Sequence, residues 1–314
     1  MYDLPSLIFM GTPGFAVPSL RALLDAGAPI LLVVTQPDRP KGRGRRVAAP
    51  PVKQLAQERG LEVYQPKKVK SAEAVERITA RGPSCLVVVA YGQLLSAEIL
   101  EIPPLGAVNV HASLLPKYRG PAPIHWALIQ GEMETGVTTM FMDAGMDTGD
   151  ILLQRKAVIQ PEETAGSLHD RLAEQGARVL VETLDLLKRG SLEPKIQDSS
   201  QATYAPMLAK EDGKVDWHEE AKRICCRIRG LDPWPGSFTS WQGKRLKLFG
   251  CRALSISTQA EPGTVIAAAE DGLQVAAGEG AVLIETLQLE GGRPLAVSDF
   301  LRGHHFQVED KLGE

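Results

Sequence analysis

Three side chains near the middle of the sequence have the types and spacing that acid–base chemistry needs. Asn109 and His111 lie two residues apart in an apolar segment, so on a β-strand both point to one face, about 6.6 Å apart. The asparagine amide donates hydrogen bonds and does not titrate, whereas the imidazole exchanges a proton near neutral pH. Asp147, which lies between two glycines, adds a carboxylate.

The segments around these residues favour a site over a buried core histidine. Residues 113–120 have the composition of a rigid loop that is neither helix nor strand. Residues 143–150 connect two predicted strands, and their glycines let the backbone come close to a ligand. Asp143 and Asp150 flank the strands and suit turn capping, so Asp147 is the acid that we expect to face the cleft.

The first half of the chain alternates apolar strands with helices, which predicts the scaffold for these residues. Strands are expected at 7–10, 30–35, 61–64, 85–90, 107–111, 137–142 and 151–159. Helices are expected after Gly14 and at 51–59, 71–80, 124–130 and 167–188. Near-continuous apolar strands between helices are typical of a Rossmann-like α/β fold, with a mostly parallel sheet and helices on both faces. Ligands of such sheets bind beyond the carboxyl ends of the strands, where Asn109 and His111 would stand.

The pattern changes near residue 190. A polar stretch at 191–206 is typical of a linker, and it is followed by a helix over 216–228 and then by short strands with glycine-rich turns. These strands are expected at 237–241, 245–249, 263–267, 273–276 and 282–289, and they predict a small β-barrel. We therefore expect a catalytic domain at 1–190, a linker at 191–206 and a C-terminal domain at 207–314.

Composition excludes several classes of protein. The chain has 314 residues and a formal net charge of −3, so it is not a uniformly basic nucleic-acid binder. No apolar run approaches the roughly 20 residues of a membrane span, and the N-terminus lacks a basic signal-peptide segment. The four cysteines form no CxxC pair. We expect reduced cysteines, no metal and a cytoplasmic location.

Positive charge is nevertheless concentrated at residues 39–46, where five basic side chains occur without an acid. Glycines and prolines prevent a helix there, so an exposed loop is expected. A run of like charges is commonly only a solvated surface, but this density beside a predicted cleft favours contact with phosphate. Smaller basic groups occur at 222–229 and 244–247 in the barrel half.

The glycines after the first strand form only part of a dinucleotide-binding motif. Gly11-Thr-Pro-Gly-Phe15 lacks the second glycine of G-x-G-x-x-G, and Asp38 lies beyond the end of the next strand. A tight strand-to-helix turn is therefore the preferred interpretation.

Several segments together resemble the folate-dependent formyltransferases, and most closely those members that act on methionyl-tRNA. The resemblance covers almost the whole chain and is carried by Gly11–Phe15, Thr35–Gly44, Asn109–Gly120, Gly136–Thr139, Met146–Ile151 and Pro233–Gly236. Two positions depart from the family pattern. Ala144 replaces a frequent acid and Pro121 a frequent alanine, and neither belongs to the trio.

The resemblance implies roles for specific residues. Asn109, His111 and Asp147 correspond to the catalytic residues, and Ser113, Leu114, Leu115 and Pro116 correspond to a stretch that binds 10-formyltetrahydrofolate. The loop with Arg43 corresponds to one that enters the acceptor end of tRNA, and its charge extends the expected tRNA contacts to Lys41, Arg45 and Arg46. The C-terminal part would be an oligonucleotide-binding-type barrel.

The implied activity is transfer of the formyl group of 10-formyltetrahydrofolate to the α-amino group of methionine on initiator Met-tRNA. The residue types suit this chemistry, because attack of an amine on a formyl carbon creates an oxyanion that Asn109 and a protonated His111 could stabilise. A free α-amino group titrates near ~8, so a modest base suffices. Which group moves which proton stays open. We also expect a cis Leu115–Pro116 bond, a monomeric protein and no membrane partner.

Other functions stay open at this point. The chain could formylate a glycinamide ribotide or a nucleotide-linked amino sugar, although single-domain glycinamide enzymes would leave the barrel half unexplained. A nucleotide-binding oxidoreductase is disfavoured by the incomplete glycine motif. A non-catalytic tRNA-binding module is disfavoured by the intact trio of Asn109, His111 and Asp147.

The basic loop gives the first testable prediction. Arg43→Ala is expected to raise KM for tRNA and to lower the salt dependence of binding by about one phosphate contact, because one charge is removed from the proposed contact. Steady-state kinetics across a salt series measure both quantities. Unchanged tRNA kinetics would remove this loop from the site.

Overall fold

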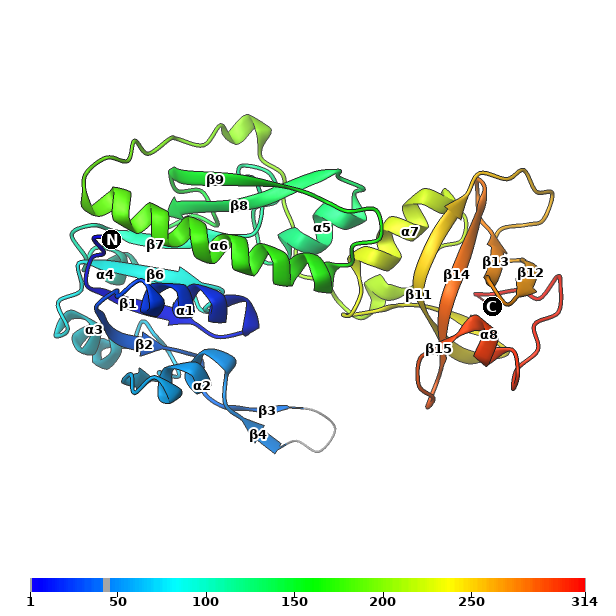
Figure 1. Ribbon diagram of the computed structural model, residues 1–314, viewed down its shortest axis with the longest axis horizontal. Helices are drawn as coiled ribbons and strands as arrows, with labels where there is room; N and C mark the ends of the chain where they lie inside the picture. Colours follow the sequence, from blue (N-terminus) through cyan, green and yellow to red (C-terminus); the bar gives the residue numbers. More distant parts are fainter. Residues whose placement is uncertain (1, 42–45, 314) are drawn as a thin grey trace. The chain divides into compact units, whose positions relative to one another are not determined.

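The computed structural model describes residues 2–41 and 46–313, except for the side chains of Lys41 and Arg46. The described chain divides into two compact units (Figure 1). The first unit contains the chain up to Gly120 together with Glu134–Val158 and His169–Tyr204. The second contains Pro121–Met133, Ile159–Leu168 and the chain from Ala205 onwards.

The first unit is built on one seven-stranded sheet. Its strands, in spatial order, are β5 (Val63–Tyr64), β2 (Ile30–Val34), β1 (Leu7–Gly11), β6 (Cys85–Val89), β7 (Ala107–His111), β8 (Glu134–Phe141) and β9 (Ile151–Val158). The strands from β5 to β7 are parallel, whereas β8 and β9 run antiparallel. The predicted Rossmann-like, mostly parallel sheet is therefore confirmed.

Helices cover both faces of this sheet. Figure 1 shows α1 (Val17–Asp25) and α6 (Ala165–Lys188) lying across one face. A Cβ on Gly176 of α6 would lie 2.9 Å from the Cγ1 of Val110, so α6 sits directly on the Val110 side of β7. The opposite face packs against α3 (Ala72–Thr79) and α4 (Ala97–Leu100), which contribute buried side chains to a core beneath β1, β2 and β6. As predicted, Ser71 caps α3 through its hydroxyl.

The basic segment forms a hairpin in its described part, where the sequence predicts only loop. β3 (Arg39–Lys41) pairs antiparallel with β4 (Arg46–Ala48). The register places Arg39 opposite Ala48, so main-chain hydrogen bonds stabilise both arms despite the flanking prolines. The helix α2 (Pro51–Glu58) follows.

The turn after β1 is hydrogen-bonded to the ends of the neighbouring strands. The Thr12 hydroxyl donates to the Tyr91 carbonyl and accepts from the Gln36 amide. Asp38 accepts from Lys53 Nζ through both oxygens, at 2.7 and 2.9 Å, and from Gln65. These hydrogen bonds, that of Lys53 first, lower the pKa of Asp38. The interpretation of Gly11–Phe15 as a tight turn is thus confirmed by its contacts, and η1 (Gly14–Ala16) leads directly into α1.

The second unit is an antiparallel sheet with helices at one side. Its main path is β10 (Ser237–Trp241), β11 (Lys244–Leu254), β14 (Ala281–Leu289), β13 (Gly272–Ala276) and β12 (Val265–Ala269), with β15 (Leu295–Ala296) paired to β14. The helices are α5 (Pro123–Ile129), α7 (Ala221–Gly230) and α8 (Val297–Phe300), with 3-10 turns η2 (Ser199–Gln201) and η3 (Glu211–Gly213) elsewhere in the chain. The C-terminal domain of short antiparallel strands that the sequence predicts is therefore present.

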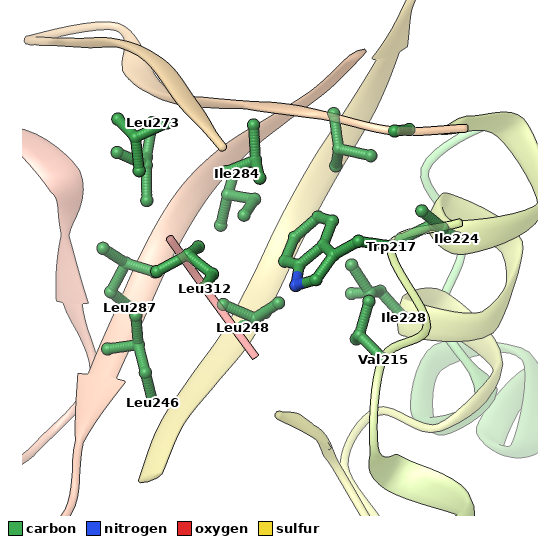
Figure 2. Close-up of a cluster of buried hydrophobic side chains, with 14 of the residues drawn as sticks. Val215, Trp217, Ile224, Ile228, Leu246, Leu248, Leu273, Ile284, Leu287 and Leu312 are labelled. Carbon is green, nitrogen blue, oxygen red and sulfur yellow. The ribbon is translucent and has the colours of Figure 1, made fainter. Parts of the chain in front are cut away.

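The C-terminal segment links the two edges of this sheet. The Leu312 amide donates to Gly263 next to β12, and the Gly313 amide donates to Ser240 of β10. The closed sheet surrounds one apolar core, in which the Trp217 indole lies among side chains of the strands and of α7 (Figure 2). The Trp217 Nε1 donates to the Thr239 hydroxyl at 3.1 Å, which satisfies its only polar group.

The helix predicted over 216–228 begins five residues later than expected. The Asp216 carboxylate accepts from the His218 main-chain amide, which forms a local turn, and Trp217 is drawn into the core. α7 begins at Ala221, whose amide donates to the Glu279 carbonyl in the connection between β13 and β14. Burial of the tryptophan therefore outweighs the helical pattern of the sequence. None of the helices within the described ranges has the length and apolarity that crossing a bilayer needs.

The core of the second unit gives a stability prediction. Leu248, 1% exposed, lies at the centre of the cluster in Figure 2, so Leu248→Ala is expected to destabilise the protein by about 2–5 kcal/mol. Chemical denaturation measures this loss. Val308→Ala is the matched control, because Val308 is 65% exposed, and its midpoint should equal that of the parent protein. Equal stability of both variants would contradict this description of the core.

Candidate active site

The carboxyl end of β7 presents two polar side chains on one face. Asn109 pairs with Val88 of β6 and Met140 of β8, and His111 pairs with Thr138 of β8. Val110 between them points to the other face, beneath α6. The strand alternation predicted from the sequence is confirmed, and it places Asn109 and His111 together on the face away from α6.

The His111 ring is buried, at 6% exposed, and both of its nitrogens face oxygen atoms. Nε2 lies 2.9 Å from the carbonyl oxygen of Tyr118, and because a carbonyl only accepts, Nε2 carries the proton. Nδ1 lies 3.6 Å from Oδ2 of Asp147. That distance exceeds a hydrogen bond, so Nδ1 is the nitrogen that can exchange a proton beside the carboxylate.

Asp147 approaches His111 from the loop between β8 and β9. Its Oδ2 accepts a hydrogen bond of 2.8 Å from the Gly120 amide. Its backbone has φ +54°, a left-handed conformation that aspartate adopts more readily than most residues. By contrast, the Asp143 carboxylate accepts from Gly145 and Thr148 within its own turn. The structure thus brings Asp147, rather than Asp143, to His111.

Asn109, the third residue of the group, has a side-chain amide that stays available for a ligand. It is half-buried, and its side-chain amide forms no hydrogen bond within the described part of the chain. A half-buried amide with free donors, two residues from a buried histidine, is placed to bind an oxygen atom of a ligand.

Hydrogen bonds of the Thr138 side chain, on β8, fix the main chain of the loop after β7. The Thr138 hydroxyl donates to the Ser113 carbonyl at 2.7 Å and accepts from the Leu115 amide at 3.2 Å. The expected cis Leu115–Pro116 bond is confirmed. Ser113 and Leu115 have buried side chains, whereas Leu114 and Pro116 are half-buried, so the latter two and the main chain are what the loop offers to a ligand.

Sequence reasoning missed three residues of this region. The guanidinium of Arg119 and the amide of Gln197 are both buried and hydrogen-bonded to each other, and Thr203 contacts the turn that contains Arg119. Arg119 belongs to a loop that the sequence singles out, but its partner lies 78 residues away in the polar stretch at 191–206. The composition of that stretch carries no signal of a buried glutamine.

The candidate tRNA contacts lie mostly outside the described residues. Arg43 and Arg45 fall there entirely, as do the side chains of Lys41 and Arg46. In the second unit, Arg227 donates to the Asp212 carbonyl and Arg229 to that of Glu163. Their helix therefore uses these two cations for internal contacts, while Lys222 and Arg223 are exposed to solvent.

No metal-binding cluster occurs among the described residues, in which no three His, Cys, Asp or Glu side chains converge as ligands. All four cysteines are free thiols.

Comparison with known proteins places both halves of the chain. Residues 6–184 match the family model described as formyl transferase, and residues 207–305 match the formyl transferase C-terminal domain. The methionyl-tRNA formyltransferase of Geobacter sulfurreducens is 51% identical over 308 residues, covering 98% of this chain and 96% of that protein.

Solved structures share the fold at low sequence identity. The N-formyltransferase of Helicobacter canadensis, in complex with folinic acid and dTDP-3-aminofucose, has a TM-score of 0.65 and 17% identity, covering 90% of this chain and 98% of its own. HypX of Aquifex aeolicus in complex with tetrahydrofolic acid has a TM-score of 0.62 and 20% identity, covering 98% of this chain and 50% of its own.

The tight turn that presents Asp147 gives a prediction. A Cβ on Gly149 would overlap the Phe141 carbonyl oxygen, so Gly149→Ala must displace the loop and is expected to cost about 1–3 kcal/mol. Thermal unfolding measures this cost. Gly14→Ala is the matched control, since a Cβ on Gly14 would meet no atom within 4 Å, and it should unfold like the parent. An unshifted midpoint for Gly149→Ala would refute the tight fit.

Proposed function

The chain belongs to the formyl transferase family, and on this premise we propose that Asn109, His111 and Asp147 perform its reaction. The observation that carries the proposal is the buried His111–Asp147 contact of 3.6 Å beside an Asn109 amide that is unpartnered within the described chain. An uncharged donor, a titratable ring and a carboxylate are thereby gathered at the end of one strand.

The reaction is transfer of a formyl group from 10-formyltetrahydrofolate to the α-amino group of methionine on initiator Met-tRNA. The amine nitrogen bonds to the formyl carbon, and the bond from that carbon to the folate nitrogen breaks. The proton that the amine loses is balanced by the proton that the released folate nitrogen gains. The products are formyl-methionyl-tRNA and tetrahydrofolate.

Asn109 is proposed to stabilise the negative charge that develops on the formyl oxygen. Its amide is half-buried and uncharged, so it donates to that oxygen at every pH. A donor placed in this way contributes about 10²–10³ in rate, because it already points to where charge appears.

His111 and Asp147 are proposed to accept and return the proton. Because Nε2 donates to Tyr118, only Nδ1 is available for exchange, and it faces the Asp147 carboxylate. A protonated ring would then have acceptors at both nitrogens, and the carboxylate would offset its charge.

The folate is proposed to lie against residues 113–116. Since Ser113 and Leu115 have buried side chains, contact falls to Leu114, Pro116 and the main chain of the loop. The Thr138 hydrogen bonds hold this main chain in place before a ligand binds, and preorganisation of this kind reduces the entropy cost of binding.

The tRNA is proposed to contact Lys41, Arg43, Arg45 and Arg46, and the C-terminal barrel is proposed as a second tRNA-binding region. Residues 1–190 would form the catalytic domain, 191–206 the linker and 207–314 the tRNA-binding domain. We further propose that the protein is a monomer and acts in the cytoplasm.

A direct assay tests this function and its alternatives. The enzyme is incubated with 10-formyltetrahydrofolate and methionyl initiator tRNA, and formyl-methionine is released and quantified. Glycinamide ribotide and a nucleotide-linked amino sugar are run in parallel as acceptors. Formylation of the tRNA is expected, and turnover of a small acceptor alone would overturn the proposed acceptor.

Substitutions in the trio give the matching prediction. Asn109→Ala and His111→Ala are each expected to lower kcat by about 10²–10³, because each removes a group that acts as charge develops. Single-turnover rates at saturating substrate measure the chemical step. A kcat within a few-fold of the parent for either variant would refute its proposed role.

A further inference from the structure

A three-residue turn contacts both sides of the proposed site through its main chain. The Tyr118 carbonyl accepts from His111 Nε2 at 2.9 Å, and the Gly120 amide donates to Asp147 Oδ2 at 2.8 Å. Tyr118 has φ +60° and Gly120 has φ +118°, so the turn follows a backbone path open mainly to glycine. One short segment thus orients the imidazole and the carboxylate together.

Arg119, at the centre of this turn, extends the contact to the main chain of the Asp147 loop. Its side chain is 3% exposed, and its Nε and Nη2 donate to Gln197 Oε1 at 3.1 and 2.9 Å. Gln197 is 6% exposed, and its Nε2 donates to the carbonyls of Asp147 and Gly149 at 2.9 and 2.7 Å. These two side chains therefore bridge the turn and the loop from within the protein.

The chemistry of the partners leaves only one arrangement of this bridge. A guanidinium can only donate and a backbone carbonyl can only accept, so the Gln197 amide must present its oxygen to Arg119 and its nitrogen to the loop. Glutamate could replace only the first contact, because its second oxygen would face two carbonyl oxygens. A neutral side chain with both a donor and an acceptor is needed at position 197.

The turn is itself fastened to the segment that carries Gln197. The Arg119 amide donates to the Thr203 carbonyl, and the Tyr118 amide donates to the Thr203 hydroxyl, both at 2.9 Å. Ile151 at the start of β9 also pairs with Lys195. Residues 195–203 therefore lie along the site and hold the turn as well as the loop.

We propose that Arg119 and Gln197 are positioning residues for formyl transfer, which keep Asp147 directed at His111 by tying its main chain to the turn that holds the imidazole. The left-handed backbone of Asp147 is a conformation that few side chains adopt without support from their surroundings. Loss of the bridge frees the loop and moves the carboxylate, and a displacement of about 1 Å can cost about a hundredfold in rate. This inference rests on the role proposed above for Asp147.

Two substitutions at position 197 test the bridge. Gln197→Leu removes both contacts, and Gln197→Glu keeps an acceptor for Arg119 while repelling the loop carbonyls. Both are expected to lower kcat at least about tenfold, with KM for Met-tRNA and for 10-formyltetrahydrofolate changed less than about threefold. Arg119→Lys, which keeps one donor, is expected to retain more activity than Arg119→Leu. Wild-type kcat in Gln197→Leu or Gln197→Glu would overturn the proposal.

A double-mutant cycle separates this inference from the proposed function. If Gln197 acts through Asp147, Gln197→Leu should slow the Asp147→Asn enzyme by less than about twofold, so that the two effects are not additive. Fully additive losses would overturn the positioning role and leave the role of Asp147 intact. Wild-type kcat in Asp147→Asn alone would instead overturn the proposed function.

A control variant separates positioning from general loss of stability. The Thr183 hydroxyl is buried, donates to the Val179 carbonyl at 2.7 Å and pairs with the Thr139 hydroxyl at 2.8 Å, so its hydrogen bonds within the described chain involve neither the turn nor the loop. Thr183→Val is expected to lower the unfolding temperature without changing kcat at a temperature where the protein is folded. If Thr183→Val and Gln197→Leu lower the unfolding temperature and also lower kcat to the same extent, the specific role of Gln197 would be overturned.

Discussion

The hydrogen bond from His111 Nε2 to the Tyr118 carbonyl is the interaction on which the proposed chemistry depends. It assigns the proton to one ring nitrogen and directs the other toward Asp147, so it decides which atom can exchange a proton. The next residue but one, Gly120, holds the Asp147 carboxylate. The relative placement of a base and its partner is therefore a property of one turn rather than of two independent loops.

The sheet places His111 and the loop that carries Asp147, which the turn alone cannot do. β7 pairs with parallel β6 on one side and antiparallel β8 on the other, and the β8–β9 connection, which begins beside Ala107 at the amino end of β7, carries Asp147. Thr138 of β8 fixes the loop after β7 from beneath. His111 and Asp147 lie 36 residues apart in the sequence and meet because this connection brings Asp147 back to His111 and to the Gly120 amide. The second unit has an apolar core of its own.

Local patterns predict most of the scaffold and the identity of the trio. Period-two alternation places Asn109 and His111 on one face, and capping chemistry separates Asp143 from Asp147, because both signals lie within a few residues. The role of Gln197 cannot be predicted from the sequence, because it depends on Arg119 and on two carbonyls that approach Gln197 only in the folded chain. The start of α7 was missed for a similar reason, because the burial of Trp217 is a tertiary effect. The hairpin β3–β4 also escapes prediction, as its prolines suppress the strand signal.

Nitrogen-15 NMR of the enzyme labelled at histidine determines which ring nitrogen of His111 carries the proton. The His111 signals are assigned by their loss in His111→Asn, and long-range proton–nitrogen correlations then report which ring nitrogen carries the proton in the neutral form. The hydrogen bond to Tyr118 predicts a neutral ring protonated at Nε2, with Nδ1 unprotonated beside Asp147. A neutral His111 protonated at Nδ1 would contradict the account, because the turn would then not orient the ring as described.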